Sequence, residues 1–417
     1  MRLPCFEPKG KWPQSQGEFS LQSTREVGVN WLAVSSLIFG RVVYAVNWCN
    51  LAAVFTFTAS ELKLNIYGLG LATAAFFVGI GIFQVPGGVL AARVGPRLTA
   101  VYGTFVASMA ALLTGLAGNL LEIMVLRFFV GAGMALVFPP GVILMAKFLR
   151  GGSEALGVGL YNSAFSGGGV LGLFGWAVLA ATVGWRNSLI FSGLLGLLTA
   201  VLILLLVPKD SGRPDFAVKL GHLKQILSDR MLILLSIVML GFQVGSTVYN
   251  SFMIYYLHDT SRLSVGGAGI IAALASIFAF LSAPLAGRLY DKYPETKKLL
   301  LASGAVMAFG LGLVYFGTVD LAILSGILVG LGYGTGFTIG FSAARQANKL
   351  DVEYETLAVS WVNSISLFGN FIPSTLFSYF VLQYGYSSAW LSMATLSFLL
   401  IVPVASRERK RKTNLHQ

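Results

Sequence analysis

Charge is scarce in this sequence. Only 11% of the 417 residues are charged, whereas 56% are hydrophobic, and the mean hydropathy is +0.76. Soluble globular chains usually carry about 25% charged residues. A chain this apolar has too little polar surface to face water on all sides. The composition therefore predicts a protein that crosses the lipid bilayer several times.

Features that would indicate an enzyme are also missing. The two cysteines, Cys5 and Cys49, lack the spacing of a disulfide framework or a zinc site. The sequence has no Walker loop, HExxH motif or nucleophile elbow. We therefore expect a protein that is not an enzyme and that holds no metal or cofactor. The first 26 residues are charged and contain proline, so they predict a tail and not a cleavable signal.

Long uncharged runs recur along the chain. A helix needs roughly 20 residues to cross about 30 Å of hydrocarbon. Two predicted spans carry one arginine each, Arg41 in 29–57 and Arg127 in 121–146, and residues 356–406 hold two helices around a break at 383–388. The prediction is an all-α membrane protein with twelve transmembrane helices. The eight remaining spans are 64–92, 98–121, 155–185, 187–208, 231–257, 263–287, 299–319 and 321–344.

The formal charge of +12 is unevenly placed along the chain. If the N-terminus is inside, cytoplasmic segments hold 24 of the 29 Lys and Arg residues and the opposite loops hold three. This distribution follows the positive-inside rule. We therefore predict a multi-pass protein of the cell membrane with both termini cytoplasmic. The basic run 407–412 would lie near lipid headgroups, and we expect no nucleic-acid partner.

The chain contains an internal repeat. Glu154-Ala-Leu-Gly-Val-Gly-Leu-Tyr-Asn-Ser163 is echoed 201 positions later, and Gly184 matches Gly385 at the same offset. Six crossings return a chain to its starting side, so the repeat predicts two pseudo-symmetric bundles in parallel. Such halves, with a substrate site between them, are typical of alternating-access carriers. The predicted parts are tail 1–26, bundle 27–208, cytoplasmic linker 209–230, bundle 231–405 and tail 406–417.

Two motifs resemble those of the major facilitator superfamily. The loop Gly88-Val-Leu-Ala-Ala-Arg-Val-Gly-Pro-Arg97 is similar to its Gly-x-Leu-Ala-Asp-Arg-x-Gly-Arg loop, and Arg127-Phe-Phe-Val-Gly-Ala-Gly133 is similar to its Arg-x-x-x-Gly-x-Gly helix. The resemblance covers nearly the whole chain and implies the major facilitator fold. Asn50-Leu51, 83–88 and Phe138-Pro139 look most like the anion:cation symporters of that superfamily. That likeness implies transport of organic acids such as sugar acids, often with protons.

The chain departs from the superfamily pattern at the loop after span 2. The family's loop aspartate is Ala92 here, whereas the second half keeps Asp291. By resemblance, such an aspartate caps a helix of the opposite half, where a carboxylate meets the positive end of the helix dipole. We therefore expect a one-sided conformational latch that involves Arg93 and Asp291. The alternative is that both are ordinary loop charges.

A second departure lies in the first span. The symporters carry Asp-Arg directly before Asn-Leu, but this chain has Asn47-Trp48. Arg41 lies seven residues earlier, on nearly the same helix face and roughly 10 Å away along the axis. Asn50 falls on the opposite face and is expected to pack. Span 5 has the glycine-rich segment 166–172 in place of the Gly-Pro signature of drug–proton antiporters, which favours helix packing there and argues against drug efflux.

The arginines within the spans lack an acidic partner, because no carboxylate lies deep within a predicted span. An unpaired arginine in hydrocarbon is unfavourable by several kcal/mol. An anionic substrate would supply the missing charge, since guanidinium groups pair with carboxylates in a bidentate manner. Backbone carbonyls, tyrosines and water are the alternative partners of Arg41. For Arg127, substrate contact and a structural role are both open, and pairing with Glu122 has poor geometry.

By resemblance, spans 1, 4, 7 and 10 line the cavity. The predicted substrate-binding residues are therefore Arg41, Tyr44, Trp48, Arg127, Gln243, Tyr249, Asn250 and Tyr333. No histidine or carboxylate in the spans offers an obvious proton carrier, so co-transport of a proton is open. The sequence thus predicts a monomeric secondary active or facilitative transporter of small organic anions, carboxylates or sugar acids. A multidrug efflux carrier is the alternative.

Overall fold

The computed structural model describes residues 30–149, 154–209, 228–293, 295–346 and 352–406. Both predicted tails and most of the predicted linker lie outside these ranges. Within them, every regular element is a helix. The N-terminal group consists of α1 (Trp31–Leu62), α2 (Ile66–Val94), α3 (Pro96–Thr114), α4 (Leu120–Ala135), α5 (Phe138–Phe148), α6 (Glu154–Val170), α7 (Trp176–Val183) and α8 (Trp185–Leu206).

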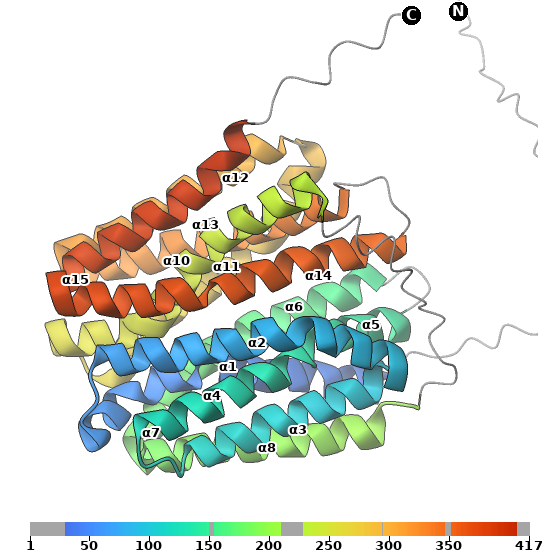
Figure 1. Cartoon of the computed structure of the whole chain (residues 1–417), viewed down its shortest axis with the longest axis horizontal. Helices are drawn as coiled ribbons and strands as arrows, with labels where there is room; N and C mark the ends of the chain where they lie inside the picture. The colour runs from blue at the N-terminus through green and yellow to red at the C-terminus, as the bar shows by residue number, and fades with distance from the viewer. Residues whose placement is uncertain (1–29, 150–153, 210–227, 294, 347–351, 407–417) are drawn as a thin grey trace, which may run out of the picture.

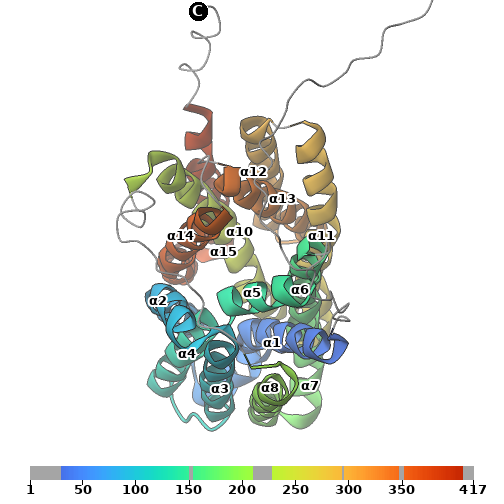
Figure 2. The same ribbon diagram turned by 90° about the vertical axis from the view of Figure 1, so that its right-hand side faces the viewer.

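The C-terminal group consists of α10 (Arg230–Ser261), α11 (Val265–Lys292), α12 (Thr296–Leu313), α13 (Val319–Gln346), α14 (Val352–Gly369) and α15 (Phe371–Ile401). The helices of each group pack into a bundle, and the two bundles lie side by side with their long helices nearly aligned (Figure 1). Viewed along the helices, the blue and green N-terminal group and the yellow to red C-terminal group remain separate (Figure 2).

The number of spans agrees with the sequence prediction. Eleven helical stretches among the described residues are long and apolar enough to cross a membrane. The last of them, Ala358–Ala405, is 48 residues long and is divided by Gly385, whose backbone is non-helical (φ 80°, ψ 170°). This division lies within the predicted break at 383–388. The all-helical fold with twelve crossings is thereby confirmed.

The repeat is visible in the backbone itself. Gly184, with φ 85° and ψ 154°, separates α7 from α8 as Gly385 separates the two halves of α15. The helices α1 and α10 are both 32 residues long, and each ends on a left-handed residue, Lys63 or Arg262. The first helix of each group therefore has the same length and the same kind of end, and the same glycine break recurs near the end of each group.

Two of the predicted spans, 121–146 and 155–185, are each present as one membrane-length stretch, but each contains a local irregularity. The span expected at 121–146 breaks between α4 and α5, directly before Phe138-Pro139-Pro140. Proline has no backbone N–H and disturbs the preceding turn, which explains the break. The span expected at 155–185 contains a π-helical turn at Leu171–Gly175 between α6 and α7. Such turns shift the helix face that follows.

The two bundles make close contacts at the end where α1 turns into α2. A Cβ atom on Gly70 of α2 would lie 2.8 Å from the backbone oxygen of Ser374 in α15, and one on Gly269 of α11 would lie 3.0 Å from that of Leu173. Phe55 of α1 meets Tyr255 of α10 with 5.6 Å between ring centroids. At the other end of α2 and α11, a Cβ on Gly88 or Gly287 would meet nothing within 4 Å.

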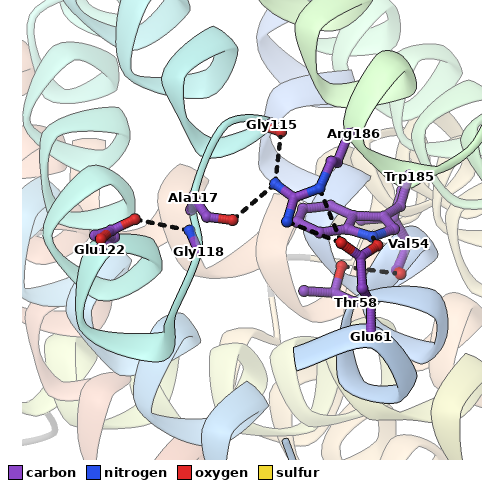
Figure 3. A network of polar contacts seen from close by, with 9 residues as sticks. All are labelled: Val54, Thr58, Glu61, Gly115, Ala117, Gly118, Glu122, Trp185 and Arg186. Carbon is purple, nitrogen blue, oxygen red and sulfur yellow. Dashed lines mark hydrogen bonds and ion pairs between the residues drawn. The ribbon is translucent and has the colours of Figure 1, made fainter. Parts of the chain in front are cut away.

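A polar network fixes this same end of the N-terminal bundle (Figure 3). Trp185 Nε1 donates to Glu61 at 2.6 Å, and Arg186 donates to the same carboxylate through Nε at 3.0 Å and Nη2 at 2.9 Å. Arg186 Nη1 also donates to the backbone oxygens of Gly115 and Ala117. The network joins the end of α1, the turn between α3 and α4, and the start of α8.

The backbone of Gly385 leads to a stability prediction. Replacing Gly385 with alanine should lower the free energy of unfolding by about 1–3 kcal/mol, because positive φ combined with extended ψ is nearly exclusive to glycine. Gly287→Ala is the matched control, since both new methyl groups would have open space around them and only Gly385 has a positive φ. Thermal unfolding in detergent measures the difference. Equal melting temperatures for the two variants would contradict the proposed strain.

Candidate functional site

Arg41 lies inside the N-terminal bundle, on the long helix α1. It is ten residues after Trp31, or about 15 Å along the helix axis, so it lies about a third of the way along α1. Its side chain is only 6% exposed. Among the described residues, ion pairs join Arg186 to Glu61 and Lys298 to Glu295, and neither involves Arg41. The guanidinium is thus buried without an acidic partner.

Aromatic rings take the place of that partner. The guanidinium carbon of Arg41 lies 4.4 Å from the ring centroid of Tyr44, 4.6 Å from those of Phe138 and Phe165, and 5.0 Å from that of Tyr161. We call these four residues the aromatic cage. Each cation–π contact contributes about 0.5–2 kcal/mol, more when the cation is desolvated. The cage therefore offsets much of the unfavourable free energy of holding a charge in this position.

The cage leaves the hydrogen-bonding capacity of Arg41 incomplete. Nε and Nη1 are both buried, and neither has a hydrogen-bond partner among the described residues. The hydroxyl of Tyr44 does interact with the guanidinium. Buried N–H donors without an acceptor are rare and unfavourable, and they mark a place where a ligand can supply one. Arg41 is thus equipped to receive an anionic group.

Arg127 is buried to a similar extent, 3% exposed, but has protein partners. Its Nη1 donates to the backbone oxygen of Asn47 at 3.1 Å, and its Nη2 donates to Asn50 Oδ1 at 2.6 Å. Asn50 in turn donates to Asn47 Oδ1 at 3.1 Å and to Ser192 Oγ at 2.9 Å. Arg127 therefore joins α4 to α1, and through Asn50 to α8.

The sequence did not reveal this network. Asn50 was expected to pack on the face of α1 away from Arg41; it does lie there and is fully buried, but its side chain holds Arg127. Glu122, the acidic partner considered for Arg127, instead accepts from Gly118 N at 2.7 Å and Asn119 Nδ2 at 2.6 Å. The asparagine spacing on α1 was a usable signal, because Asn47 and Asn50 are i, i+3 neighbours on one helix.

In the C-terminal bundle, the positions equivalent to Asn50 and Arg127 are uncharged. The residue numbers of α1 and α10 differ by 199. With this offset, Tyr249 is the repeat equivalent of Asn50, and Gly326 is the repeat equivalent of Arg127. Tyr249 is fully buried, and its hydroxyl donates to the backbone oxygens of Ile271 at 3.2 Å and Ala322 at 3.4 Å. The hydroxyl of Tyr249 occupies the space beside Gly326. This position in the repeat therefore serves helix packing in both halves.

A neutral polar strip lies on the facing side of the C-terminal bundle. Gln243, Ser246 and Asn250 follow one face of α10 at i, i+3 and i+7. Tyr333 of α13 donates to Gln243 Oε1 at 3.4 Å, and Asn250 Nδ2 donates to Ser246 Oγ at 3.2 Å. Asn250 Oδ1 is buried without a partner. Tyr333, at one side of this strip, lies within electrostatic reach of Arg41 across the boundary between the bundles.

The structure thus groups most of the predicted substrate-binding residues. Tyr44 and Trp48 follow Arg41 on the same face of α1, with 6.0 Å between their ring centroids. Gln243, Asn250 and Tyr333 belong to the polar strip of the C-terminal bundle. Tyr249 and Arg127 lie elsewhere, in the helix-packing positions described above. Phe138, Tyr161 and Phe165 belong to the cage but were not predicted, because α5 and α6 reach Arg41 only through the tertiary fold.

The predicted latch is only partly described. Arg93 is exposed near the end of α2. The backbone of Asp291 lies in α11, but its side chain is outside the part that the structure describes. The contact that Asp291 was expected to make with a helix of the opposite half therefore stays a prediction.

A cavity of about 250 Å³ lies at a distance from Arg41, between the ends of α1 and α10. It is lined by Thr56, Ala59, Ser60, Leu64, Tyr255, His258 and Asp259. The carboxylate of Asp259 accepts from Tyr386 at 2.9 Å and would repel an anion. We therefore place the candidate site at Arg41 and not in this cavity.

The two buried arginines should respond differently to removal. Arg127→Met should lower the free energy of unfolding by about 2–4 kcal/mol, because Asn50 Oδ1 and the Asn47 carbonyl lose their donors. Arg41→Met should leave stability unchanged or raise it, because a buried charge without an acidic partner disappears. Thermal unfolding of both variants in the same detergent is the measurement. A larger loss for Arg41→Met than for Arg127→Met would contradict this assignment.

Comparison with known proteins places the chain in a family. The family model described as Major Facilitator Superfamily matches residues 37–348 and 245–417. The chain is 25% identical over 276 residues to the probable galactarate/D-glucarate transporter GudP of Escherichia coli, a match that covers 56% of this chain and 59% of that protein. It is 26% identical over 282 residues to the probable sulfoacetate transporter SauU of Cupriavidus necator, covering 63% and 65%.

The matched part of the chain thus spans about three fifths to two thirds of these relatives. Among solved structures, the chain superimposes on the nucleoside transporter NupG with a TM-score of 0.76 and 14% identity, covering 90% of this chain and 99% of that one. At this identity the likeness shows the fold alone. Because the family model covers most of the sequence and the fold agrees, this multi-pass membrane chain belongs to the Major Facilitator Superfamily.

Proposed function

We propose that this protein is a secondary carrier of small organic anions and that Arg41 binds the anionic group. The observation that carries the proposal is the buried guanidinium of Arg41, with Nε and Nη1 unpaired beside the boundary between the bundles. A carboxylate or sulfonate would accept from these donors in a charge-assisted contact. The relatives named above are described as transporters of galactarate, glucarate and sulfoacetate, which are organic anions.

The contacts between the bundles support an alternating-access mechanism. The bundles meet closely at the end of the α1–α2 turn, through Gly70 and Gly269, and are free of such contacts around Gly88 and Gly287 at the other end. If both termini are cytoplasmic, as the charge distribution predicts, the bundles are in close contact at the outer end of this state and lack such contacts around Gly88 and Gly287 at the cytoplasmic end. Rocking of the bundles about the Arg41 site would then reverse the access.

The contact surfaces themselves are suited to such movement. The glycines at these contacts let helices of opposite bundles approach closely without interlocking side chains. The predicted latch between Arg93 and Asp291 would act at the end that lacks such contacts in this state. The monomeric state and the location in the cell membrane belong to the same proposal.

No side chain of the described spans supplies an obvious proton carrier near Arg41. The described carboxylates that accept hydrogen bonds, such as Glu61 and Asp259, lie near helix ends. The binding step therefore depends on a permanently charged arginine. Coupling to a proton would have to use a proton carried by the substrate or a group at a helix end.

Removal of the guanidinium tests the proposal. Arg41→Ala should weaken binding of a transported organic acid by about 10- to 100-fold, the range for a lost charge-assisted contact, and should abolish uptake into reconstituted vesicles. Arg41→Lys should retain part of the affinity, because it keeps the charge but not the bidentate geometry.

Arg288→Ala is the matched control for this experiment, since Arg288 is an exposed arginine near the end of α11. It should bind and transport as the unmodified protein does. Unchanged affinity and uptake for Arg41→Ala would rule out the proposed role of Arg41. The assay combines isothermal titration in detergent with uptake of a radiolabelled organic acid by vesicles.

A further inference from the structure

The position of the two arginines around α1 limits the charge of the ligand. Asn50 is nine residues after Arg41, which places it about 180° around the helix axis. Arg127, held by Asn50 and the Asn47 carbonyl, therefore lies behind α1 when viewed from Arg41. Because α1 stands between the two guanidinium groups, one small ligand cannot bind both.

The facing bundle adds no second cation. Its polar strip consists of Gln243, Ser246, Asn250 and Tyr333, all of them neutral. The position that corresponds to Arg41 in α10, again 199 residues later, is Leu240. In the middle parts of the described spans, Arg41 and Arg127 both keep an unpaired donor. Because Arg127 lies behind α1, Arg41 is the guanidinium that can face a ligand between the bundles.

The surface next to Arg41 is aromatic. Phe138, Phe165 and Trp48 are partly exposed, so a ligand that approaches the guanidinium meets ring faces and edges. Trp48 packs against Phe76, Phe77 and Phe165, with ring centroids 4.8–5.7 Å apart. It also borders two buried hydrophobic clusters, each of which includes residues of both bundles. Such walls favour apolar or aromatic groups and offer few acceptors or donors to a chain of hydroxyls.

We infer that the substrate is a monoanion: one carboxylate or sulfonate on an apolar or aromatic body, with any further polar group neutral. The acid group would bind Arg41, the body would contact the rings of the cage and Trp48, and a neutral group would meet Asn250 Oδ1 or Gln243. This inference rests on the proposed function and narrows it. A second carboxylate would be buried without a cation, which is strongly unfavourable.

Matched pairs of acids test the inference directly. Purified protein in detergent is titrated with benzoate against terephthalate, hexanoate against adipate, and gluconate against glucarate, with benzamide as the uncharged probe. We expect benzoate or hexanoate to bind at least about tenfold more tightly than its dicarboxylate partner. Benzamide and both sugar acids should bind more weakly than benzoate.

Each outcome of this panel decides between the two proposals. Tighter binding of adipate, terephthalate or glucarate than of the matched monoacid would overturn the monoanion inference and leave organic-anion transport intact. Tighter binding of gluconate than of benzoate and hexanoate would contradict the inference that the substrate has an apolar body. If benzamide binds with the affinity of benzoate, the proposed function is overturned together with the inference. The same follows if no acid in the panel binds.

A change of specificity gives a second, independent test. Gln243→Arg places a cation on the strip that faces Arg41, so it should improve the affinity for terephthalate relative to benzoate by about tenfold or more. Phe165→Leu keeps an apolar side chain but removes one ring of the cage, and it should weaken benzoate more than hexanoate. Arg288→Ala should alter neither ratio. An unchanged terephthalate-to-benzoate ratio in folded Gln243→Arg protein would count against the inference.

Discussion

A guanidinium group keeps its proton in proteins, so a chain that buries one within a membrane must surround a permanent charge. Arg41 lies on α1, and Arg127 of α4 contacts α1 at Asn50, nine residues further along; each arginine meets a different environment. Arg127 receives backbone and amide oxygens from Asn47 and Asn50. Arg41 receives four aromatic rings and keeps two donors unpaired. This difference separates a structural arginine from one that can bind a ligand.

The internal repeat supports the same distinction between Arg41 and Arg127. The bundles share the length of their first helix and a glycine turn, as Gly184 and Gly385 show, yet neither arginine has a cationic counterpart in the C-terminal bundle. Leu240 corresponds to Arg41, and Gly326 with Tyr249 corresponds to the Arg127 pair. A feature needed by the fold alone is expected in both halves in some equivalent form, as the Tyr249 packing illustrates. The cage has no such equivalent in the C-terminal bundle, as expected if it serves the proposed binding of one small anion.

The arrangement of the bundles connects this site to movement. Glycines bring α2 close to α15, and α11 close to the segment around Leu173, at one end of the molecule, while the Glu61–Arg186 network makes that end of the N-terminal bundle rigid. Contacts without interlocking side chains can separate with little rearrangement inside either bundle. In the proposed mechanism, a shift of one bundle would change access to the site beside Arg41 without disturbing the cage.

The sequence by itself determined the spans, their number and the repeat, because hydrophobicity, charge and turn residues are local properties that the bilayer acts upon directly. It also identified Arg41 as a charge without an acid, since that follows from counting carboxylates. Only the tertiary structure decided which arginine donates hydrogen bonds to protein oxygens and which is surrounded by aromatic rings. Asn50 and Arg127 are 77 residues apart, and the rings of Phe138, Tyr161 and Phe165 come from helices whose rotation about their axes depends on packing and on the breaks at Pro139 and at the π-helical turn. Those rotations arise from contacts between distant segments, which no local pattern encodes.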